Sequence, residues 1–215
     1  MYRYTALGDS ITAGYSATAP AFAYPSRVVR LLGATTPAVG EVLAEPGWTS
    51  ADLETAVLSN SPVPLSAANG ISIWVGGDDL IQTALQSLQS GRLSSARTLM
   101  PGTLRHYGRD IGTLVGAIRR VSKARLVLCT QYNPFPNSPA ATEAIAGLNS
   151  VTQAVAQRTG AVLAPVHEWF AGNQANLIRG YRTGRIEDVL HGHPAVHPNN
   201  RGHEVIATNL APLLA

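Results

Sequence analysis

Two short stretches at opposite ends of the chain carry side chains that could do nucleophilic chemistry together. Near the N-terminus, Ser10 follows a run of aromatic and β-type residues (2–7) that reads as a buried strand. Near the C-terminus, His197 lies in a loop directly before a predicted helix (200–214). A serine hydroxyl becomes a useful nucleophile when an imidazole takes its proton. Ser10 and His197 are therefore a candidate pair for acyl chemistry.

Both stretches also have simpler explanations. Asp9 and Ser10 are residue types common in turns and helix caps. Four of the six histidines fall close together, at His191, His193, His197 and His203. Their spacing lacks the helical His-x-x-x-His pattern and no cysteine lies nearby, so no metal site is predicted. The residues after Ser10 also lack the second glycine of the Gly-x-Ser-x-Gly nucleophile elbow. This excludes the nucleophile elbow of the α/β-hydrolases.

The elements that must position these residues alternate between strands and helices. Strands are predicted at 2–7, 38–43, 71–75, 125–130 and 161–165. Helices are predicted at 24–33, 50–58, 79–88, 104–121, 140–159 and 200–214. This order predicts an α/β fold of three layers (α/β/α), flavodoxin-like, with a five-stranded parallel sheet in a single domain spanning residues 1–215.

A parallel sheet would bring several distant residues to one edge. Ser10, Gly47 and Asp78 each follow a predicted strand, and the carboxyl ends of parallel strands meet at the same edge. The loop before the last helix could deliver His197 to that edge as well. Two further segments are expected to shape a pocket there. They are a less regular stretch (91–102) and a loop with exposed aromatic residues (132–137).

Four blocks, in order along the chain, resemble those of the GDSL or SGNH hydrolase family. They are Gly8-Asp9-Ser10-Ile11, a lone Gly47, Gly76-Gly77-Asp78-Asp79 and His197-Pro198-Asn199. The resemblance implies an SGNH-type fold, with Ser10 as nucleophile and His197 as general base. It also implies an oxyanion hole formed by the backbone N–H groups of Ser10 and Gly47 and by the side chain at position 78. Asp9 and Asp79 would support the turns, and no cofactor is implied.

Two positions depart from the family pattern. Asp78 replaces the family's asparagine, and an ionised carboxylate donates no hydrogen bond to an oxyanion. A protonated Asp78 could still donate, which would favour activity at mildly acidic pH. Pro194 occupies the position of the family's acid, three residues before the histidine. A backbone carbonyl from residues 193–195 is the favoured substitute for orienting His197, which would give a Ser-His dyad.

Two carboxylates, Asp188 and Glu168, are alternatives to that carbonyl. The predicted function is a serine esterase that hydrolyses short-chain acyl esters through an acyl-enzyme on Ser10. One alternative is a binding protein on the same scaffold that has lost catalysis. Another is an acyltransferase to a sugar or alcohol acceptor, which shares the acyl-enzyme and differs in how well it excludes water.

Composition limits the other possibilities. The formal net charge is only +3 and the arginines are scattered, so nucleic-acid binding is not expected. The single cysteine, Cys129, cannot form a disulfide within the chain. No signal peptide and no run long enough to span a membrane is visible. The expected location is the cytoplasm, or outside the cell if a leader has been removed, and the expected partner is a small ester substrate. The sequence leaves the oligomeric state open.

Overall fold

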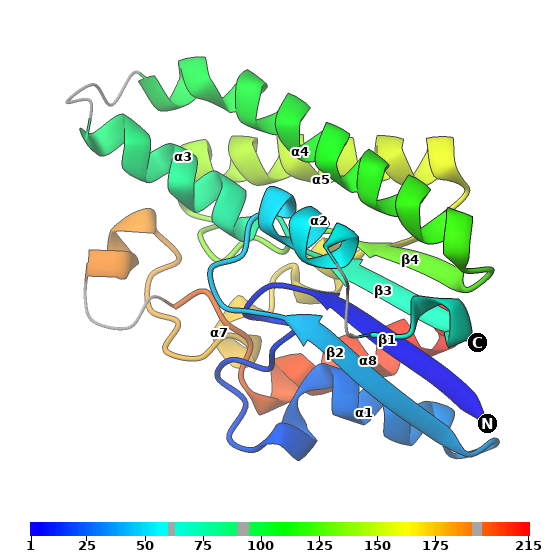
Figure 1. Ribbon diagram of the computed structural model, residues 1–215. Coiled ribbons are helices and arrows are strands. Elements are labelled where there is room, and N and C mark those ends of the chain that lie inside the picture. Colours follow the sequence, from blue (N-terminus) through cyan, green and yellow to red (C-terminus); the bar gives the residue numbers. More distant parts are fainter. Residues whose placement is uncertain (60–62, 90–94, 191–194) are drawn as a thin grey trace.

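A five-stranded parallel sheet forms the centre of the molecule (Figure 1). The computed structural model describes residues 1–59, 63–89, 95–190 and 195–215. The strands lie side by side in the order β2-β1-β3-β4-β5, and every neighbouring pair is parallel. Their bounds are Tyr2–Gly8 (β1), Ala38–Ala44 (β2), Gly70–Trp74 (β3), Arg125–Cys129 (β4) and Val162–Ala164 (β5). The predicted sheet and its flavodoxin-like strand order are confirmed.

Helices cover both faces of this sheet (Figure 1). One face carries α1 (Tyr24–Leu32) and the terminal helix α8 (Asn200–Leu214). The other face carries α2 (Ser50–Leu58), α4 (Ser95–Val121) and α5 (Pro139–Thr159), with α3 (Gly77–Gln89) beside α4. Along the chain, two short helices, α6 (Val166–Phe170) and α7 (Gln174–Leu177), come between β5 and α8. The three predicted layers are therefore present.

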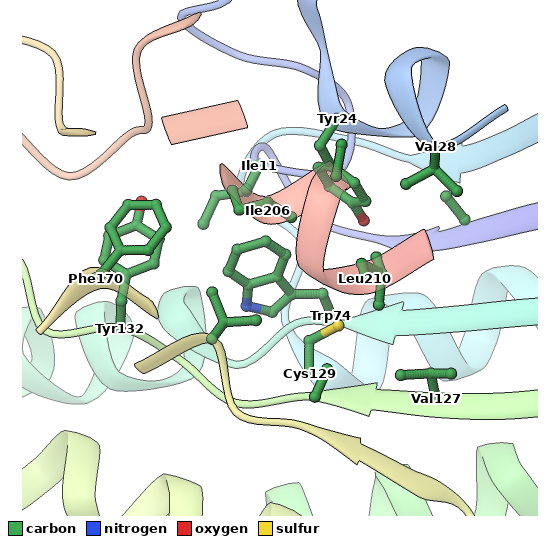
Figure 2. Close-up of a cluster of buried hydrophobic side chains, with 14 of the residues drawn as sticks. Ile11, Tyr24, Val28, Trp74, Val127, Cys129, Tyr132, Phe170, Ile206 and Leu210 are labelled. Atoms are coloured by element: carbon green, nitrogen blue, oxygen red, sulfur yellow. The ribbon is translucent and has the colours of Figure 1, made fainter. Parts of the chain in front are cut away.

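Alternating side chains on the strands fill two separate cores. On β4, Leu126 and Leu128 point into the core under α4 and α5, whereas Val127 and Cys129 point into the core under α1 and α8. Figure 2 shows this second cluster around Trp74. A strand whose side chains are buried on both faces needs a continuous apolar run, and this explains the composition of β4.

Local signals set several helix ends as the sequence predicts. Thr49 caps α2 in a capping box with Asp52. Asn199 caps α8 by accepting hydrogen bonds from the N–H groups of two residues in its first turn. Gly160 ends α5 in the left-handed region, with a φ of 65°.

Two local predictions are wrong. Helix α4 begins at Ser95 rather than near residue 104, and it continues through Pro101. A proline usually ends a helix, but here packing against α3 maintains it, and Thr103 shares a 2.7 Å hydrogen bond with Thr83. The aromatic side chains of Tyr132 and Phe135 are buried rather than exposed. None of the helices in the described ranges combines the length and apolar character that a membrane crossing requires.

Candidate active site

The carboxyl ends of three strands lie level at one edge of the sheet. Gly8 at the end of β1 pairs in register with Ala44 of β2 and with Trp74 of β3. The loops that follow β1 and β2 carry Ser10 and Gly47. Gly8 is required at this point because a Cβ there would lie 2.2 Å from the carbonyl oxygen of Trp74. The close approach of β1 and β3 therefore fixes where the chain turns toward Ser10.

Ser10 and His197 are brought together from positions 187 residues apart. The Oγ atom of Ser10 lies 3.0 Å from Nε2 of His197, within hydrogen-bonding distance. Ser10 is buried and His197 is half-buried. Burial lowers the pKa of His197 to about 4, so the ring is neutral at neutral pH and can accept a proton from the hydroxyl.

The backbone on either side of His197 is held by hydrogen bonds from other elements. The carbonyl of His197 accepts a 2.9 Å hydrogen bond from the N–H of Arg179. The hydroxyl of Tyr132 donates to the carbonyl of Val196. The Tyr132 ring is itself buried and stacks on Phe170, with ring centroids 4.2 Å apart (Figure 2). The end of β4 and the α7–α8 region therefore fix the position of this loop.

The orientation of the imidazole is not explained by either carboxylate that the sequence suggested. Asp188 accepts hydrogen bonds from Thr183 and from the N–H of Gly184, so it stabilises its own turn. Glu168 has a largely exposed side chain beside His167. Within the described residues, no hydrogen bond joins a carboxylate to His197. Of the favoured carbonyls at 193–195, those of residues 193 and 194 lie outside the described residues, as does Pro194 itself.

Gly47, in the loop that follows β2, has an open backbone surface. Its φ is +88°, and a Cβ at this position would meet no heavy atom within 4 Å. Between the described residues, no hydrogen bond engages the N–H of Ser10 or of Gly47. Glycine at this position therefore leaves open space next to a backbone N–H that no described residue engages.

Three carboxyl groups, those of Asp9, Asp78 and Asp79, interact electrostatically near the turn that carries Ser10. Asp9 is buried, and its Oδ1 accepts a 3.0 Å hydrogen bond from the N–H of Ile11, which closes the turn around Ser10. Burial raises the pKa of Asp9 to about 7, and the charges of Asp78 and Asp79 add to the shift. Burial, followed by the charge of Asp79, also raises the pKa of Asp78. The structure thus favours the neutral acid at both positions more than water would.

Asp79 connects the third block to the loop that carries Gly47. Its Oδ2 accepts a 2.9 Å hydrogen bond from the N–H of Ser50, and its Oδ1 lies 2.6 Å from the Ser50 hydroxyl. The same hydroxyl lies 3.1 Å from Oδ2 of Asp110 on α4. A hydroxyl has one proton and cannot donate to both carboxyl groups. Both contacts are hydrogen bonds when a protonated Asp79 donates to Ser50, and burial raises the pKa of Asp79.

Sequence reasoning missed Ser50 and Asp110 as parts of the site. Ser50 directly follows the helix cap Thr49, and this position at the end of the second block is the one available signal. Nothing in the sequence relates Ser50 to a carboxylate on α4. In the parts of the chain that the structure describes, no three His, Cys, Asp or Glu side chains are grouped so that they could hold a metal ion.

Known proteins resemble this chain in fold and in sequence pattern. The lipase Lip_vut3 from a goat rumen metagenome superposes with a TM-score of 0.79 at 22% identity, over 99% of this chain and 97% of the lipase. Axe2, an acetylxylan esterase from Geobacillus stearothermophilus, gives a TM-score of 0.73 at 19% identity, over 100% and 94% of the two chains. These identities support the common fold.

A third structure and a family model complete the comparison. LAE5, an alpha/beta hydrolase enzyme from the metagenome of Lake Arreo in Spain, gives a TM-score of 0.72 at 18% identity, over 99% of this chain and 94% of that enzyme. A comparison with curated protein sequences gives no match. The model of the GDSL-like Lipase/Acylhydrolase family matches residues 6–205, nearly the whole chain. The chain therefore belongs to this family, a family of carboxylic ester hydrolases of the SGNH type.

Proposed function

We propose that this protein hydrolyses short-chain acyl esters through a covalent acyl-enzyme on Ser10. The observation that supports this most directly is the 3.0 Å contact between Ser10 Oγ and His197 Nε2. As Oγ attacks the ester carbonyl, His197 takes the hydroxyl proton and then gives it to the departing alkoxide. A water molecule then attacks the acyl-enzyme while His197 takes its proton. The bond to Ser10 breaks, His197 returns the proton to Ser10 Oγ, and the acid is released.

The negative charge that develops on the carbonyl oxygen needs donors fixed in advance. The N–H groups of Ser10 and Gly47 supply two, and a protonated Asp78 would supply the third. The imidazolium formed at His197 has no carboxylate partner among the described residues. We therefore assign a Ser-His dyad, in which loop contacts position the base.

A short acyl chain fits the surroundings better than a long one. The aromatic residues Tyr132 and Phe135, which follow β4 near this edge, are packed into the protein interior. They are not available to line an apolar groove for a fatty acyl chain. A second candidate, a binding protein on the same scaffold, is favoured by two observations, the carboxyl group at position 78 and the absence of an acid at Pro194.

Hydrolysis of p-nitrophenyl esters from acetate to palmitate, measured from pH 5 to 9, tests the proposal. We expect turnover to be highest with the short esters and to be abolished in Ser10→Ala. Ser16→Ala is the matched control. Ser16 lies in the same loop, and its φ of 71° strains a serine and an alanine alike, so this change should not disturb the backbone. Equal background rates in Ser10→Ala and the wild type would support the binding protein instead. A new ester formed when an alcohol is added would identify an acyltransferase.

A further inference from the structure

The ring of Tyr15 packs against the imidazole of His197. Their ring centroids are 4.6 Å apart, with an angle of 51° between the planes. Tyr15 belongs to the nucleophile's own turn, because its N–H donates a 2.9 Å hydrogen bond to the carbonyl of Ser10. The backbone bends sharply on both sides of it, with φ values of 85° at Gly14 and 71° at Ser16. The turn thus carries a nucleophile and, five residues later, an aromatic neighbour for its base.

A second histidine, His203, hydrogen-bonds to the backbone of Tyr15. His203 on α8 is fully buried, and its Nδ1 accepts a hydrogen bond from the N–H of Tyr24 at 3.3 Å. Its Nε2 therefore carries the proton and donates to the carbonyl of Tyr15, also at 3.3 Å. Burial lowers the pKa of His203 to about 4, so this imidazole is neutral at neutral pH. His203 fixes the backbone of Tyr15 and adds no charge near His197.

His197 becomes a cation during the reaction, and a cation in a partly buried site needs a stabilising partner. In a triad a carboxylate has this role, but no described carboxylate contacts His197. The face of an aromatic ring attracts a cation within about 6 Å of its centroid. Among the described residues, the titratable groups that interact with His197 are Tyr15 and the neutral His203. Of these, the Tyr15 ring is the group that can meet the imidazolium.

We propose that Tyr15 is a positioning residue that holds the imidazole of His197 toward Ser10 and stabilises its cationic form, in part replacing the absent acid. This inference rests on the proposed function. Cation–π contacts of this kind change a rate by about tenfold. The aromatic ring of Tyr15, and not its hydroxyl, makes this contact, so phenylalanine should replace tyrosine and leucine should not.

The test compares Tyr15→Phe with Tyr15→Leu. We expect Tyr15→Phe to keep kcat for p-nitrophenyl acetate within about twofold, and Tyr15→Leu to lower kcat about tenfold with little change in KM. Phe22→Leu is the matched control, because Phe22 is a similarly exposed aromatic residue whose recorded ring partner is Arg27. That control should leave kcat unchanged.

A titration of the imidazole by NMR gives a second, independent readout. Loss of a cation partner lowers the pKa of His197 in Tyr15→Leu, whereas loss of mere shielding from water would raise it. A raised pKa, an unchanged kcat in Tyr15→Leu, or equal losses of kcat in both variants would overturn the proposal. A wild-type protein without Ser10-dependent turnover would refute the proposed function instead, and the titration would still decide whether Tyr15 stabilises the cation.

Discussion

In the proposed mechanism, the carboxyl group of Asp78 limits how well the site stabilises an oxyanion. It donates a hydrogen bond only when protonated, and its pKa is raised by burial and by the charges of Asp79 and Asp52. The protonated fraction grows as pH falls through that raised pKa. His197 remains an available base until the pH approaches its own pKa of about 4. Activity should therefore be higher at mildly acidic pH than at pH 8.

Asp78→Asn should remove this dependence, because an amide donates at every pH. We expect kcat/KM for p-nitrophenyl acetate to rise by about 100- to 1,000-fold at pH 8 and to become flat across pH 5 to 8. Steady-state rates at half-unit pH intervals would show this. If the Asp78→Asn variant kept the pH profile of the wild type, position 78 would not contact the oxyanion.

The protonation state of Asp9, in the turn that carries Ser10, affects the stability of the folded protein. Burial raises its pKa from the ordinary 3.8 to about 7, so the folded protein binds this proton more tightly than the unfolded chain does. The stabilisation is complete below pH 3.8 and is lost as pH rises through 7. Urea unfolding should show a free energy of unfolding that falls between pH 5 and 8 by about 3 kcal/mol from this group.

In Asp9→Asn, which keeps the acceptor for Ile11 without a charge, most of that fall should disappear. The exposed Glu45→Gln is the control and should reproduce the wild-type curve. Parallel curves for the Asp9→Asn protein and the wild type would contradict the raised pKa.

Among the secondary-structure elements, the end of β4 holds the loop that carries His197. The buried Tyr132 hydroxyl donates to the carbonyl of Val196, and removing it leaves that carbonyl without this donor. Tyr132→Phe should lower stability by about 1 to 2 kcal/mol and should lower kcat several-fold by loosening His197. Thermal melts and steady-state kinetics would measure the two effects.

Tyr107→Phe provides a matched control for this prediction. Tyr107 is also a buried tyrosine, and its hydroxyl shares a 2.8 Å hydrogen bond with Thr152 in the opposite core. We expect a similar loss of stability with kcat unchanged. If the two variants lost kcat equally, the effect would come from general destabilisation and not from the His197 loop.

For the molecule as a whole, Cys129 reports the integrity of the core. This thiol is 2% exposed at the end of β4, and burial raises its pKa, so the reactive thiolate is suppressed. A disulfide reagent should not react with Cys129 while the protein is folded. Labelling should therefore proceed only as fast as the protein unfolds globally. Phenylmethylsulfonyl fluoride should inactivate the enzyme without touching Cys129. Rapid labelling of Cys129 in the native protein would contradict its burial.

Sequence patterns alone were enough to predict the order of strands and helices and most of their bounds. Gly160 at the end of α5 and Asn199 at the start of α8 act within one turn of chain, so local chemistry is sufficient to predict them. The four blocks likewise identified Ser10 and His197 as candidates. The beginning of α4 was predicted wrongly, because packing against α3 carries that helix through Pro101.

Which distant groups meet was settled only by the folded arrangement. The 3.0 Å contact of Ser10 with His197, the burial of Tyr132 and the bridge from Ser50 to Asp79 and Asp110 all join elements far apart in the chain. The strand order predicts that Ser10 and His197 share an edge of the sheet, but the distances, the burial and the bridge depend on how the helices pack on the sheet. The pKa values that set the chemistry depend on the same packing, since burial is their largest cause.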